Sequence, residues 1–79
     1  MTTLREFWES YHREVIPPTA PDVQVIECRR AFMAGAQAML LLSQEISVNA
    51  VDLDEGAAGL DALEEELNQF CRDVLAGRA

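Results

Sequence analysis

The sequence contains no lysine, one histidine and two cysteines, and each of these shortages argues against a class of chemistry. His12 and Glu9 have the E-x-x-H spacing of carboxylate-bridged metal sites, but such sites need that motif twice. The cysteines form no C-x-x-C pair, so redox catalysis is disfavoured, and we expect two reduced thiols rather than a disulfide. No nucleophile stands beside a base, and the glycines form no phosphate-binding loop. We therefore expect no enzyme, no cofactor and no metal site.

Long apolar runs are also missing. None approaches the roughly 18 residues needed to span a bilayer. The first ten residues, MTTLREFWES, have neither the basic start nor the apolar core of a signal peptide. We therefore expect no membrane contact and a cytoplasmic location.

Positive charge is scarce, because six arginines oppose fourteen acidic residues and give a net charge of −8. The imbalance is concentrated in residues 31–79, where nine acids face two arginines, a net charge of −7. Such a surface repels nucleic acid and lipid headgroups. It suits a partner protein with a basic surface, although an acidic face that only keeps the protein soluble is the alternative.

Apolar side chains recur at helical spacing in three segments, which predicts an all-α fold with a single domain over residues 1–79. The expected order is a helix over about 4–15, a proline-rich break over 16–19, a helix over about 20–47, a turn over 48–56 and a helix over about 57–76.

The expected helix ends follow from capping chemistry. Thr3 and Glu6 form an S/T-x-x-E capping box at the first helix, and Pro17 ends that helix. Thr19 is the candidate cap of the second helix, and Gly77 is the candidate C-terminal cap of the third.

The two longer helices carry matching apolar seams with steps of three and four residues, which predicts an antiparallel helical hairpin. A turn near residue 50 would bring Cys28 level with Cys71. The seams consist of Val25, Cys28, Phe32, Gly35, Met39, Leu42 and Ile46 on one helix and of Leu60, Leu63, Leu67, Phe70 and Val74 on the other.

Residues 38–42 of the second helix are apolar on every side, and a first helix of three turns is too short to cover them. A second copy of the chain is the expected cover, giving a helical-bundle homodimer or higher oligomer. A monomer whose patch binds another molecule is the alternative. Gly35 would allow a close approach, either by Trp8 or Phe7 of the same chain or by a second copy. The candidate interface residues are Gly35, Ala38, Met39, Leu41 and Leu42.

Arginines would gather at one end of the hairpin and could bind a small anion such as a nucleotide, because arginine binds phosphate bidentately and aromatic rings stack on bases. The ordinary alternative is surface ion pairing of Arg30 with Glu27 and of Arg72 with nearby acids. The candidate ligand-binding residues are Arg29, Arg30, Arg72, Arg13 and Tyr11.

The segment QVIECRRAFMAGAQAML, residues 24–40, resembles small uncharacterised proteins of tailed bacteriophages and prophages that carry Q-x-x-E-x-R-x-A-F-x-A-G. Many of these also have an upstream tryptophan, a proline-rich break and an acidic, leucine-rich last helix, features shared by this chain. Met33 departs from the aromatic residue that is frequent at its position. The resemblance implies a phage accessory protein in the bacterial host cell that binds a host protein, such as an inhibitor of a host defence or regulatory system. A nucleotide-sequestering oligomer and a structural phage component are the alternatives.

Overall fold

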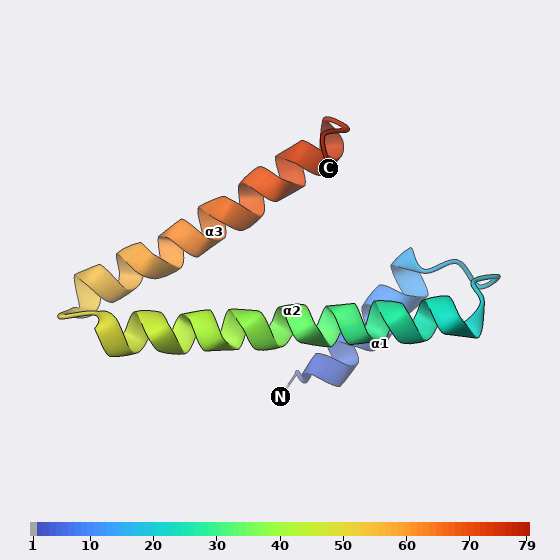
Figure 1. Cartoon of the computed structure of the whole chain (residues 1–79), viewed down its shortest axis with the longest axis horizontal. Coiled ribbons are helices and arrows are strands. Elements are labelled where there is room, and N and C mark those ends of the chain that lie inside the picture. The colour runs from blue at the N-terminus through green and yellow to red at the C-terminus, as the bar shows by residue number, and fades with distance from the viewer. Residues whose placement is uncertain (1) are drawn as a thin grey trace. The chain divides into compact units, whose positions relative to one another are not determined.

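A computed structural model describes residues 2–79, and over that range the chain forms three helices and no strand. The helices are α1 (Leu4–Val15), α2 (Asp22–Asn49) and α3 (Leu53–Leu75) (Figure 1). The all-α class predicted from the sequence is therefore confirmed. Within the described range, none of the helices combines the length and the apolar character needed to cross a bilayer.

The chain divides into two compact units, and the division falls inside α2. The first unit ends at Leu40 and the second begins at Leu41. The first contains α1 and the first part of α2, and the second contains the last part of α2 and all of α3. The predicted hairpin depends on contacts between the two units and stays a prediction.

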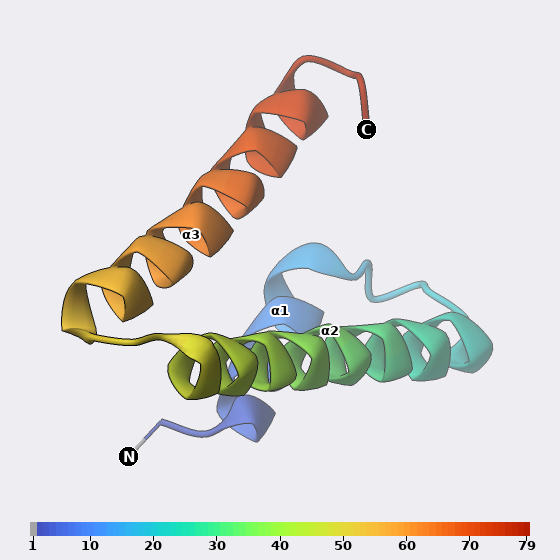
Figure 2. The ribbon, with the colours of Figure 1, turned by 60° about the vertical axis from the view of Figure 1, so that its left-hand side comes forward.

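The first unit is held together by aromatic side chains. Views from two directions show α1 lying across the N-terminal half of α2 (Figures 1 and 2). Trp8 of α1 is 6% exposed, and its ring centroid lies 5.6 Å from that of Phe32 of α2 in an edge-to-face arrangement. Tyr11 and His12 complete the cluster, with centroids 6.0 and 5.5 Å from Trp8. An aromatic pair of this kind adds about 0.5–1.5 kcal/mol to the effect of burial.

The aromatic cluster corrects one expectation about Gly35. A Cβ atom built on Gly35 would meet nothing within 4 Å, so neither Trp8 nor Phe7 fills the space beside it. Phe32, about one turn earlier on α2, offers Trp8 an aromatic edge that glycine does not have.

The connection between α1 and α2 is a tight turn rather than a helix start. The Ala20 N–H donates to the Pro17 carbonyl at 3.0 Å, and this turn includes Thr19, the expected cap. The first helical hydrogen bond of α2 runs from the Val25 N–H to the Pro21 carbonyl at 3.2 Å. The helix therefore begins two residues later than expected, and the N–H that Pro21 lacks is one that the helix would not have used.

The second unit begins with the last turns of α2, which extend to Asn49, two residues past the expected end. A short turn follows, and α3 starts at Leu53, four residues before its expected start. The Asp52 side chain causes the early start, because it accepts a hydrogen bond from the Glu55 N–H at 2.8 Å and so caps the first turn.

Gly59 explains how α3 can lie close to the end of α2. A Cβ atom at this position would lie 2.6 Å from Cγ2 of Ile46, so only glycine fits without a shift of the helices. Gly56, one turn earlier, is less constrained, because its Cβ would meet the Ala50 Cβ at an ordinary 3.7 Å.

The C-terminal end of α3 closes with a Schellman motif. Gly77 has φ +75°, the left-handed conformation that glycine adopts without a steric penalty. The Gly77 N–H donates to the Val74 carbonyl, and the Arg78 N–H donates to the Asp73 carbonyl at 2.8 Å. Gly77 therefore has the capping role predicted from the sequence.

Candidate interaction surfaces

Two of the candidate anion-binding arginines already have carboxylate partners. Arg30 pairs with Glu27 at 3.2 Å, and Arg72 pairs with Glu65 at 2.6 Å. All four side chains are more than half exposed, so each pair contributes about 0–1 kcal/mol. The ordinary ion pairing that the sequence offered as the alternative is therefore present at both residues. A phosphate group would compete with one weak, exposed carboxylate contact at each arginine.

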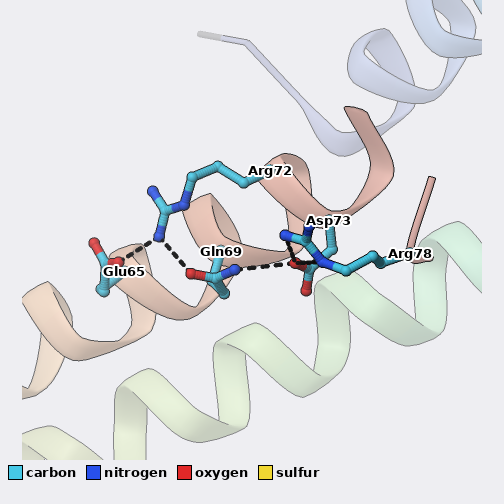
Figure 3. A network of polar contacts seen from close by, with 5 residues as sticks. All are labelled: Glu65, Gln69, Arg72, Asp73 and Arg78. Carbon is cyan, nitrogen blue, oxygen red and sulfur yellow. Dashed lines mark hydrogen bonds and ion pairs between the residues drawn. The ribbon is translucent and has the colours of Figure 1, made fainter. Parts of the chain in front are cut away.

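Arg72 belongs to a longer polar network on the second half of α3 (Figure 3). The same Arg72 nitrogen donates to Gln69 Oε1 at 2.8 Å, and the Gln69 amide donates to Asp73 Oδ1 at 3.0 Å. Arg78 completes the chain with an ion pair to Asp73 at 2.8 Å. The network balances two carboxylates with two guanidinium groups and holds their side chains along one side of the helix.

The remaining candidates for the anion site lie in the first unit. Arg29 is exposed on α2, and Tyr11 belongs to the aromatic cluster, with its ring centroid 5.8 Å from that of Phe32. Arg13 borders a shallow hollow together with Glu9 and His12 of the same helix. Arg72 lies in the second unit, so its convergence with these residues stays a prediction.

Residues 2–79 contain neither a cluster of metal-binding side chains nor a disulfide bond. No three histidine, cysteine, aspartate or glutamate side chains of this range gather where they could hold a metal ion. Cys28, which is partly buried, and Cys71, which is exposed, are free thiols in the structure.

The candidate oligomer interface lies on the central part of α2, where apolar side chains face solvent. Leu41 is 57% exposed, and its neighbour Leu40 is 58% exposed. Met39, Leu42 and Ala38 are also exposed. Leu42 borders a hollow with Ile46 and Gly59 near the start of α3, whereas Leu41 does not line it.

A second apolar surface follows α3, the most acidic part of the chain. Its apolar side chains Leu60, Leu67, Phe70 and Val74 are all close to half exposed or more. Phe70 also lines a shallow hollow with the carboxylates of Glu65, Glu66 and Asp73. The sequence pattern placed Phe70 only in the apolar seam of this helix. The hollow was not predicted, because it forms between Phe70 and acidic side chains on a neighbouring face of α3.

Comparison with known proteins found no match: no family model, curated protein or solved structure matches the chain.

Proposed function

We propose that this protein is a non-enzymatic binding protein that associates with a second copy of itself and with a host protein that presents a basic surface. Its proposed setting is that of a phage accessory protein in a bacterial cell, supported by the resemblance of residues 24–40 to small phage-encoded proteins. Inhibition of a host defence or regulatory system is the proposed consequence of that binding.

The observation that carries this proposal is the exposed aromatic ring of Phe70 among carboxylates. Phe70 is 58% exposed and shares its hollow with Glu65, Glu66 and Asp73. An arginine or lysine side chain of a partner fits such a surface, because its aliphatic stem can lie on the ring while its charged head reaches Glu66. Glu65 and Asp73 already pair with Arg72 and Arg78.

The charge of the second unit favours the same class of partner. Residues 41–79 contain nine acidic residues and two arginines, and both arginines are already paired with carboxylates of α3 or its C-terminal end. The seven carboxylates in excess create a negative potential that accelerates the encounter with a basic surface and weakens at high ionic strength.

The test is capture of host proteins from a bacterial lysate by the immobilised protein and by two variants. Phe70→Ala removes the ring from the hollow, and we expect it to lose a host protein that the wild type retains. Leu53→Ala is the matched control, because Leu53 is 91% exposed on the same helix but lies outside the hollow. We also expect the captured protein to be released as the salt concentration rises.

Two results would contradict the proposal. The first is an identical set of captured proteins for the wild type and for Phe70→Ala. The second is equal loss of the captured protein from Phe70→Ala and Leu53→Ala, which would indicate non-specific adhesion of apolar side chains. Circular dichroism of each variant establishes that its helices are intact.

A further inference from the structure

The central part of α2 contains no charged residue. Residues 31–44 form an uncharged stretch of fourteen residues, which spans about 21 Å of helix. The charged residues that flank it have opposite signs, Arg30 before it and Glu45 after it. Soluble helices normally keep charged residues on their wet face, so an uncharged stretch of this length points to a covering partner.

One face of α2 unites the flanking charges with four exposed residues of this stretch. At 100° per residue, six residues from Arg30 to Glu45 fall within one 100° sector of the helix, and we call this sector the outer face. Phe32, through which α2 contacts α1, lies on the opposite side. All six outer-face residues are exposed: Arg30, Ala34, Gln37, Ala38, Leu41 and Glu45.

We infer that the outer face pairs with the outer face of a second copy in antiparallel orientation. This inference rests on the self-association included in the proposed function and specifies its geometry. The pairs Arg30–Glu45, Ala34–Leu41 and Gln37–Ala38 share one midpoint, between Gln37 and Ala38. A two-fold axis through that midpoint therefore brings each residue opposite its counterpart on the other copy, as an isologous interface requires.

Charge and side-chain size both fit the antiparallel arrangement. Arg30 of each copy meets Glu45 of the other at both ends of the interface. Leu41 of each copy lies on Ala34 of the other, so a large side chain meets a small one. In a parallel pair, Arg30 would face Arg30, Glu45 would face Glu45, and Leu41 would face Leu41. Like charges opposed at both ends would disfavour that orientation.

The ion pair between Arg30 and Glu27 is compatible with this exchange of partners. The Arg30 side chain is 74% exposed and its Glu27 partner is 64% exposed. A surface pair of this kind is weak, so Arg30 can turn toward Glu45 of a second copy at little cost.

The experiment measures the dissociation constant of the dimer by sedimentation over a concentration series. The variants are Arg30→Glu, Glu45→Arg and the double variant that carries both changes. Each single change converts two attractive contacts into two repulsive ones, and we expect it to weaken the dimer about tenfold. The double variant restores both contacts and the original net charge, so we expect it to associate as the wild type does.

A mixture of the two single variants provides a second test of the orientation. One variant has only negative charges at the two positions and the other has only positive charges. We therefore expect heterodimers to form at concentrations where neither variant dimerises alone. Arg29→Glu is the matched control: it makes the same change in charge on the same helix but lies outside the outer face, so the dimer should persist.

Leu41→Glu tests the apolar contact independently of the charge exchange. A glutamate in place of Leu41 would face Ala34 without a basic partner, and we expect a monomer at every concentration at which the wild type dimerises. Circular dichroism distinguishes this loss of association from loss of helix.

The outcomes separate the geometry from the proposed function. Wild-type protein that stays monomeric at high micromolar concentration would overturn both self-association and the outer-face pairing. A dimer that Arg30→Glu and Arg29→Glu weaken equally, or that the double variant fails to restore, would overturn the pairing alone. Host-protein capture through Phe70 is measured separately and is affected by neither result.

Discussion

Substitution of Gly59 by alanine tests how closely α3 approaches the end of α2. The added Cβ atom would lie 2.6 Å from Cγ2, 3.3 Å from Cγ1 and 3.4 Å from Cδ1 of Ile46. Carbon atoms attract one another best at about 3.5–4.0 Å, so the contact with Cγ2 is a clash, the contact with Cγ1 is tight, and the contact with Cδ1 is an ordinary one. Ile46 cannot readily turn aside, because a β-branched side chain in a helix has one strongly preferred χ1 rotamer. The helices must therefore move apart.

The expected magnitude follows from two opposing terms. Overpacking typically costs about 1–3 kcal/mol, whereas alanine is favoured over glycine inside a helix by about 1 kcal/mol. We therefore expect Gly59→Ala to lower the free energy of unfolding by about 1 kcal/mol, which corresponds to a fall in Tm of about 4–8 °C in a chain of this size.

Gly56 and Gly35 supply matched controls of opposite sign. A Cβ at Gly56 would meet Ala50 at 3.7 Å, and one at Gly35 would meet nothing within 4 Å. Alanine at either position keeps the propensity gain without the clash, so both variants should be more stable than the wild type by up to about 1 kcal/mol.

The assay is thermal and urea unfolding followed by circular dichroism at a fixed protein concentration. Ile46→Ala provides the decisive background, because it removes the three atoms that the new methyl group would meet. In that background Gly59→Ala should become stabilising, which a double-mutant cycle measures directly. The close packing of Gly59 on Ile46 would be refuted if Gly59→Ala, with Ile46 in place, raised Tm as much as Gly56→Ala does.

Two further predictions follow from the capping and pairing contacts. Asp52→Ala removes the acceptor of the Glu55 N–H and should lower the free energy of unfolding in urea by about 0.5–2 kcal/mol. Asp54→Ala, in the first turn of α3, is the control. An equal loss from both variants would show that negative charge near the helix end matters rather than the cap. Nucleotides should not stabilise the protein, because a phosphate would gain little by replacing the weak, exposed carboxylate contacts that Arg30 and Arg72 already make. A ligand present at its Kd would add about 0.4 kcal/mol, or about 2–3 °C in Tm; a wild-type shift of that size that Arg29→Glu/Arg72→Glu abolishes would instead establish the anion site.

The helix class could be predicted from the sequence because its causes are local. Apolar spacing identifies three helical segments, and the Thr3 and Gly77 caps act within a few residues of their own positions. The start of α3 was harder to predict for a physical reason. Gly56 and Gly59 both have low helix propensity, and the sequence pattern predicts a turn that includes Gly56. In the structure, the Asp52 cap starts the helix before them, and the contact with Ile46 requires glycine inside it.

The partner of Trp8 shows where sequence patterns stop being informative. Spacing placed Trp8 on the apolar stripe of α1, and small residues around Gly35 suggested a space for it. The choice between Gly35 and Phe32 depends on the crossing position of two helices, and apolar periodicity leaves that position open. The structure places Trp8 against Phe32, and a Cβ atom built on Gly35 would meet nothing within 4 Å.

The candidate site residues also differ in whether one helix or a contact between helices determines their arrangement. The Arg30–Glu27 pair could be predicted because helix geometry alone brings residues three apart together. The convergence of Arg13, Arg29 and Arg72 requires separate helices to meet, so spacing within a helix cannot establish it. The outer face of α2, like the Arg30–Glu27 pair, is determined by the geometry of one helix. Its six residues lie on one continuous helix, and their alignment about a common midpoint follows from that helix. The antiparallel pairing therefore depends on whether two copies of α2 associate in this orientation. The dimer dissociation constants of the Arg30→Glu, Glu45→Arg and double variants test that association directly.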